Sequence, residues 1–292
     1  MQSNNPVFRR SEAFNGQATG QANAYGNQTY AGNGSSYAGY GDPATWGTGT
    51  PGSPTTQGTE RRGPMTIDSV VQASAISFAA VLVAAAATWF LTPEITADMP
   101  NSELSGIFAL MTIGSLAAFG LSMVNSFKRV VSPALVLAFC LAEGVALGAI
   151  SKFFDAQFGD HIVISAVLGT FGAFIGTLAA YKFFNIKVGA KFRTFVIAAM
   201  FGMVGLMFLQ LIVSFFGADL GFSSLTGIGF VFSVLGLVLG IFMLVLDFDF
   251  AEQLIAQGAP EREAWRIAFG LTVSLVWIYT NLLRILAFFS SD

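Results

Sequence analysis

Residues 225–250 read LTGIGFVFSVLGLVLGIFMLVLDFDF, an apolar run that ends in two aspartates, Asp247 and Asp249. As an α-helix, the part of this run before Asp247 would be about 33 Å long, because a helix rises about 1.5 Å per residue. That length crosses the hydrocarbon core of a bilayer, which is about 30 Å thick. The run therefore predicts a transmembrane helix with ionisable groups near one end.

The rest of the chain repeats this pattern. Of its 292 residues, 54% are hydrophobic and only 11% are charged, whereas a soluble domain carries about 25% charged residues. The runs are too long for barrel strands and lack their alternation, so helices are the expected spanning elements. The sequence predicts an all-α membrane protein with seven spanning helices, at about residues 70–91, 104–124, 133–151, 162–181, 194–216, 225–250 and 267–289.

Basic residues occur in alternate connections, which predicts the orientation of the bundle. The first and fifth loops contain no Lys or Arg, and the third contains only Lys152. The segment before the first helix and the second, fourth and sixth loops hold Arg61, Arg62, Lys128, Arg129, Lys182, Lys187, Lys191, Arg193, Arg262 and Arg266. We expect the N-terminus in the cytoplasm and the C-terminus outside.

The first 64 residues differ from the rest of the chain. They are rich in Gly, Asn, Gln, Ser and Thr and contain no long apolar run. Such a segment cannot bury enough apolar surface to offset the loss of chain entropy on folding. We expect residues 1–64 to be a disordered, low-complexity cytoplasmic tail, followed by a seven-helix transmembrane domain over residues 65–292.

The two aspartates are the strongest site candidates, because ionisable groups at membrane depth are costly and usually functional. They are two residues apart, so their side chains point about 200° away from each other on a helix. Glu252 is expected on the same face as Asp249. The neighbouring Phe248 and Phe250 provide apolar surroundings, which makes a proton switch one interpretation. A solvated helix end is the other.

Three more polar residues are expected inside the spans. Glu143 lies about ten residues into the third helix, near the centre of the bilayer. Asn281 and Arg284 share one face of the seventh helix. Arg284 could neutralise Glu143 in a polar cluster at the midplane, or it could extend to the membrane surface. Pairs of glycines four apart, Gly144/Gly148, Gly172/Gly176 and Gly236/Gly240, predict close helix packing.

Several function classes find no support in the sequence. No H-E-x-x-H motif and no phosphate-binding glycine loop is present, so we expect neither a catalytic site nor a firm metal site nor a bound cofactor. The last helix contains no lysine that could carry a retinal Schiff base. A net charge of −3 gives no indication of nucleic-acid binding. The single Cys140 excludes an internal disulfide framework.

Three motifs resemble those of the Bax-inhibitor family, also called the transmembrane Bax-inhibitor-motif family. They are A-E-G-V-A-L-G-A-I-S at 142–151, L-D-F-D-F-A-E-Q at 246–253 and W-I-Y-T-N-L-L-R-I-L at 277–286. The resemblance extends from about Ile67 to the end of the chain. It is greatest to a bacterial subgroup with a tail rich in Gly and Asn.

The resemblance implies a bundle with the seventh helix at its centre, and a pH-sensitive calcium leak. In the family mechanism, one aspartate in the sixth helix and one in the seventh share a proton, and a basic group on the second helix completes a cytoplasmic latch. The sixth-helix aspartate corresponds to Asp247 or Asp249, and the base to Lys128 or Arg129. The seventh-helix position corresponds to Asn281, which cannot titrate.

Helix depth raises a second difference from the family mechanism. Straight helices with the predicted bounds place Asp247 and Asn281 about 15–20 Å apart in height. The family geometry would therefore require the sixth helix to continue deeper or the seventh to start later, near Leu271.

We therefore expect a multi-pass protein of the plasma membrane that leaks cations, with calcium as the permeant ion. Asp247, Asp249 and Asn281 would form the ion or proton gate, Glu143 and Arg284 a supporting polar cluster, and Lys128 or Arg129 the latch. The alternative is a non-conducting regulator that binds a membrane protease or another protein. In both cases the lipid bilayer is the expected environment, and no nucleic acid is expected as a partner.

Overall fold

The computed structural model describes residues 63–290, apart from 97–99, 160, 185 and 223–226. The predicted tail therefore lies outside the described residues, except for Gly63 and Pro64. The helices are α1 (Ile67–Leu91), α2 (Asn101–Phe127), α3 (Pro133–Phe158), α4 (Ile162–Phe183), α5 (Ala190–Phe215), α6 (Gly227–Ala256), the short 3-10 helix η3 (Glu261–Glu263) and α7 (Ala264–Ser290).

The predicted class of fold is confirmed. Seven helices in the described residues are long and apolar enough to cross a membrane. The largest differences from the predicted bounds are at the ends of α3, which continues to Phe158, and of α6, which continues to Ala256. Leu254 and Ile255 extend the helix because they pack against the core around α7. Gly258, with a φ of 66°, then reverses the chain. The aspartates consequently lie inside α6, with Asp247 nine residues before its end.

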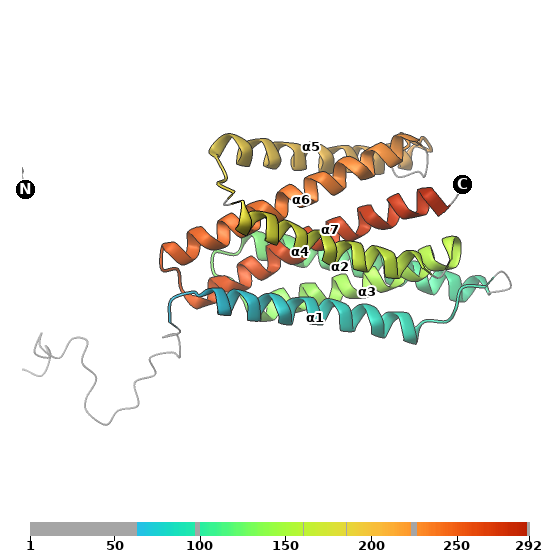
Figure 1. The fold of residues 1–292 in the computed structure, drawn as a ribbon. Coiled ribbons are helices and arrows are strands. Elements are labelled where there is room, and N and C mark those ends of the chain that lie inside the picture. The colour runs from blue at the N-terminus through green and yellow to red at the C-terminus, as the bar shows by residue number, and fades with distance from the viewer. Residues whose placement is uncertain (1–62, 97–99, 160, 185, 223–226, 291–292) are drawn as a thin grey trace, which may run out of the picture. The chain divides into compact units, whose positions relative to one another are not determined.

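Helix α7 is the core of the bundle, as predicted for the seventh helix. It packs most extensively against α1, α3, α4 and α6, and it runs between them in Figure 1. Its buried residues occur along its whole length, from Ala264 to Ala287. Helix α2 packs mainly on α3, and α5 packs mainly on α6. The buried residues of α5 are only Val196 and Met203, so this helix is held by a small interface.

Glycines allow two of the helix pairs to approach closely. A Cβ atom at Gly148 would lie 2.5 Å from the backbone oxygen of Ala85 in α1, and one at Gly144 would lie 2.5 Å from that of Val81. At Gly240, a Cβ atom would lie 2.6 Å from the Ile278 side chain of α7. These contacts agree with the predicted packing faces.

The prediction that glycines four apart allow close helix packing is wrong for the glycine pair of α4. Added Cβ atoms at Gly172 and Gly176 would meet nothing within 4 Å, and both residues are exposed on the surface of the bundle. The spacing of small residues is necessary for close packing, but it does not determine which face of a helix meets a neighbour. Gly169 marks the buried side instead, because a Cβ atom there would lie 3.1 Å from Leu282 of α7.

A short clasp joins the start of the folded region to the turn between α6 and α7. Pro64 forms an isolated antiparallel bridge with Pro260. The Met65 amide donates to the Ala259 carbonyl at 2.7 Å, and the Met65 side chain is only 2% exposed. Residues 63 and 64 thus belong structurally with the bundle. The clasp places the N-terminal end of α1 and the α6–α7 turn at the same end of the bundle.

We expect Gly148→Ala to destabilise the protein by about 1–3 kcal/mol, because the added methyl group overpacks the contact with α1. Gly172→Ala is the matched control, since it adds the same methyl group to a spanning helix in open space. The midpoint of thermal unfolding in detergent should fall for Gly148→Ala and stay the same or rise for Gly172→Ala. Equal midpoints would contradict the assigned α1–α3 contact.

Candidate functional site

Asp247 faces the central helix α7. The Ser274 hydroxyl donates a hydrogen bond of 2.6 Å to Oδ2 of Asp247. One helical turn before Ser274, Gly270 of α7 leaves room for the Asp247 carboxylate, because a Cβ atom at Gly270 would lie 3.1 Å from Oδ1 of Asp247. The side chain is half-buried. Within the part of the chain that the structure describes, no ion pair involves Asp247, and the Ser274 hydroxyl is its hydrogen-bond partner.

Asp249 points in another direction, toward α5. Its Oδ2 atom forms an ion pair of 2.9 Å with Nη2 of Arg193, a residue in the first turn of α5. The Gln253 amide donates to the same oxygen at 2.6 Å. Asp249 is 9% exposed. The two aspartates are therefore not a carboxylate pair, as helix geometry predicts for residues two apart.

Glu252 and Tyr181 extend the polar contacts of Asp249 to a third helix. The Tyr181 hydroxyl, near the end of α4, donates to Oε2 of Glu252 at 2.8 Å. Together with the Arg193–Asp249 ion pair, this bond links α4, α5 and α6 at one end of the bundle. We call Tyr181, Arg193, Asp249 and Glu252 the inner network. Arg193 and Tyr181 were missed as site residues. The sequence analysis identified Arg193 only as one of several cations in a loop, and it did not consider Tyr181.

Asn281 lies far from both aspartates. It packs against Gly236 of α6, where the side-chain oxygen of Asn281 would block any added Cβ atom. Gly236 is eleven residues before Asp247, which corresponds to about 16 Å along the helix. The Asn281 amide donates to the Trp277 carbonyl at 2.7 Å in its own helix. Ser274, rather than Asn281, is the residue of α7 that faces Asp247.

The midplane cluster expected from Glu143 and Arg284 is not assembled. Ser151 and Tyr279 are hydrogen-bonded at 2.6 Å, and this bond sets the register of α3 against α7. Glu143 lies two turns before Ser151 in α3, whereas Arg284 lies more than one turn after Tyr279 in α7. The two side chains are therefore at different depths along the bundle. The Arg284 guanidinium donates instead to the Phe222 carbonyl, at 3.3 Å. Both side chains are half-buried, and no described ion pair joins them.

The two predicted latch residues lie on the surface. Lys128 and Arg129 are exposed at the end of α2. The Arg129 backbone carbonyl accepts a hydrogen bond of 2.9 Å from Arg266. In the described residues neither basic side chain is paired with an aspartate of α6. The cation that meets Asp249 comes from α5 instead, because the end of α5 that carries Arg193 packs beside α6.

The described residues contain no group of three or more His, Cys, Asp or Glu side chains that could hold a metal ion. Nor do the two aspartates of α6 share partners. The two aspartates therefore belong to separate polar sites, since Asp247 lies against the central helix and Asp249 is part of the inner network at one helix end. These features, with seven apolar helices, define a multi-pass membrane protein with ionisable groups inside its spans.

Comparison with known families identifies the group to which this protein belongs. The chain matches the family model described as Bax inhibitor 1 like over residues 5–291. Because the match covers nearly the whole chain, the protein belongs to that family. Among curated proteins, none matches the chain.

Removing the Ser274 hydroxyl should leave the Asp247 carboxylate without its hydrogen-bond partner. We expect Ser274→Ala to lower the free energy of unfolding by about 1–3 kcal/mol, the usual cost of an unsatisfied buried polar group. Ser233→Ala is the control, because Ser233 is equally buried but donates only to the Gly229 carbonyl of its own helix. Denaturant unfolding in detergent measures both. Equal losses would contradict the assigned Ser274–Asp247 bond.

Proposed function

We propose that this protein is a proton-sensitive cation leak pathway of the plasma membrane, with calcium as the permeant ion. The observation that carries the proposal is that two aspartates in one spanning helix have different partners. Asp247 has no ionic partner in the described residues, whereas Asp249 is tied to Arg193. The first is available to a cation, and the second holds two helices together.

The surroundings of Asp247 support a role in attracting the ion. Calcium prefers oxygen ligands, and Asp247 and Ser274 present carboxylate and hydroxyl oxygens to each other across the α6–α7 interface. A carboxylate at membrane depth is costly unless it is paired, protonated or hydrated. In the absence of an ionic partner, a passing cation or a proton would relieve that cost.

The Arg193–Asp249 ion pair supports a role as the latch. It lies at the end of α5, the helix with the smallest buried surface in the bundle. Protonation of Asp249 would remove its negative charge and weaken the attraction to Arg193. The end of α5 would then be free to move from α6. In this mechanism the latch is closed while the Arg193–Asp249 ion pair is intact, and the leak increases when the pair is broken.

Calcium flux into proteoliposomes, measured across a range of pH, tests the latch. Asp249→Asn removes the negative charge that attracts Arg193, so we expect increased flux at neutral pH. Arg193→Gln removes the other partner and should have the same effect. Lys191→Gln is the control, because Lys191 is an exposed cation two residues earlier in the same helix. A change of similar size in the control would contradict a specific latch.

The same assay tests the role of Asp247. We expect Asp247→Asn to reduce flux at every pH, because the amide keeps the shape of the side chain but loses the charge that attracts the cation. Unchanged flux in both Asp247→Asn and Asp249→Asn would contradict the assignment of the two aspartates to the gate. A wild-type protein without flux at any pH would favour the alternative of a non-conducting regulator with a protein partner.

A further inference from the structure

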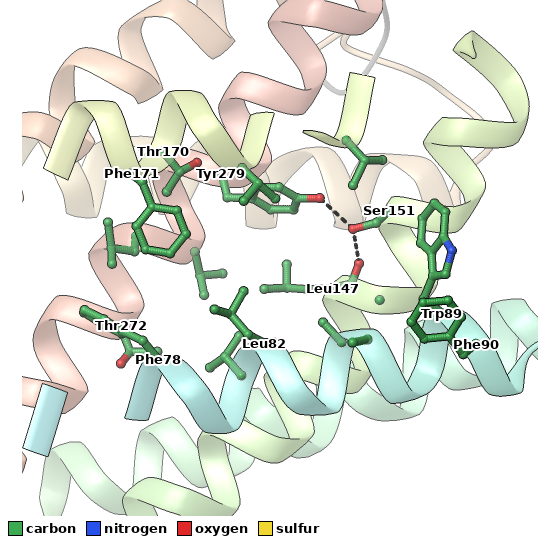
Figure 2. A pocket seen from close by; sticks show the side chains of 18 residues that line it. Phe78, Leu82, Trp89, Phe90, Leu147, Ser151, Thr170, Phe171, Thr272 and Tyr279 are labelled. Atoms are coloured by element: carbon green, nitrogen blue, oxygen red, sulfur yellow. Dashed lines mark hydrogen bonds between the residues drawn. The ribbon is translucent and has the colours of Figure 1, made fainter. Parts of the chain in front are cut away.

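A cleft of about 300 Å³ lies on the side of the bundle away from Asp247. Its walls come from α1, α3 and α4, and its floor is α7 (Figure 2). The floor residues Thr272 and Leu275 are 2% and 8% exposed, whereas the rim residues Leu82 and Phe90 are 46% and 83% exposed. The cleft therefore opens on the outer surface of the bundle, where apolar side chains face lipid. Its volume lies at the lower end of the range for ligand pockets, about 300–1,000 Å³.

The cleft runs along α1 from Phe78 to Phe90. At the end nearer the middle of α1, Phe78 contacts Phe174 of α4 edge to face, with ring centroids 5.9 Å apart. The other end reaches Trp89 and Phe90, at the end of α1. Eleven residues separate Phe78 from Trp89, which corresponds to about 16 Å along the helix. That is about half of a hydrocarbon core of about 30 Å, the depth of one leaflet.

The hydroxyl groups of the cleft are occupied within the protein. Ser151 donates to the Leu147 carbonyl at 2.5 Å, so in the 2.6 Å bond between Ser151 and Tyr279 the tyrosine is the donor. Thr170 and Thr272 donate to carbonyls of their own helices. These four are the hydroxyl side chains that line the cleft. None has a proton left for a ligand.

This arrangement favours a hydrocarbon chain over water or a polar molecule. Apolar cavities stay dry unless polar partners hold the water, and here the hydroxyl protons are already used. The Ser151–Tyr279 pair lies toward the Trp89 end of the cleft (Figure 2). Indole rings at a helix end are typical of the headgroup level of a bilayer. The polar end of the cleft would then face the headgroups, and the Phe78 end would face the middle of the bilayer.

We propose that the cleft binds one acyl chain of a phospholipid from the leaflet at which α1 ends. The chain enters between α1 and α4 and lies against Thr272, Leu275 and Val276 of the central helix. The site selects the chain by shape and apolarity, because the hydroxyls of its lining donate within the protein and the Lys152 ammonium beside Trp89 donates to the Trp89 and Thr92 carbonyls. The bound chain touches the face of α7 opposite to Ser274, so the helix whose Ser274 contacts Asp247 is also the floor of a lipid site.

Photocrosslinking tests the proposal with the full chain in liposomes. The probe is phosphatidylcholine with a diazirine near the end of one acyl chain, and the labelled residues are mapped by mass spectrometry. We expect label on Leu275 and Val276 of α7. Lipid that merely surrounds the bundle would label exposed residues such as Leu168 of α4, which is 67% exposed. Label confined to such exposed residues would overturn the proposal.

Two variants of α1 provide a matched pair. Ala86 lines the cleft, whereas its neighbour Ala87 is also exposed but lies outside it. Ala86→Trp should reduce α7 labelling severalfold by filling the cleft, and Ala87→Trp should leave it unchanged. Val167→Trp fills the cleft from α4 and should repeat the effect of Ala86→Trp. Unchanged α7 labelling in both filling variants, each with wild-type thermal unfolding, would contradict the site.

The headgroup is tested separately. Phosphatidylglycerol with the same diazirine-bearing chain should label α7 to the same extent as phosphatidylcholine. A labelling difference of several-fold between the two lipids would show headgroup recognition and would overturn selection by the chain alone. This readout does not depend on calcium flux, so it remains informative whether or not the protein conducts.

Discussion

The close antiparallel packing of α6 against α7 is the constraint on which the rest of the structure depends. Small residues on both helices make it possible: side chains of α7 occupy the space beside Gly236 and Gly240, and Asp247 of α6 occupies the space beside Gly270. Because interhelical packing in membranes depends on close contact rather than on a hydrophobic driving force, these glycines fix the register. The register in turn places the Asp247 carboxylate opposite the Ser274 hydroxyl.

Helix geometry then gives the two aspartates of α6 different neighbours. A separation of two residues turns Asp249 away from α7 and toward Arg193. The carboxylate beside the core helix and the ion pair at a peripheral helix therefore have separate partners. The central helix has a second consequence, because the face of α7 opposite to Ser274 is the floor of the lipid-facing cleft. One helix thus borders both the candidate gate and the cleft that opens on the surface of the bundle.

Much of the fold could be predicted from hydropathy, because a bilayer imposes one length scale on every span. The seven helices lie where the apolar runs predicted them. The end of α6 was placed too early, since the charged and polar residues after Asp249 resemble a helix terminus. Leu254 and Ile255 continue the helix through contacts with distant residues, and those contacts leave little local signal. The prediction of close packing at the glycine pair of α4 was wrong for a similar reason, because spacing does not specify which face of a helix is buried.

The sequence by itself determined the class of protein, the positions of the helices and the candidate carboxylates, because each of these follows from local composition and helical periodicity. It also determined that Asp247 and Asp249 point apart. Only the tertiary structure decided their partners, Ser274 and Arg193. The physical reason is that partners depend on the register and rotation of neighbouring helices. These are set by the sum of many side-chain contacts between segments far apart in the chain, as at Gly270, where the absence of one side chain admits another.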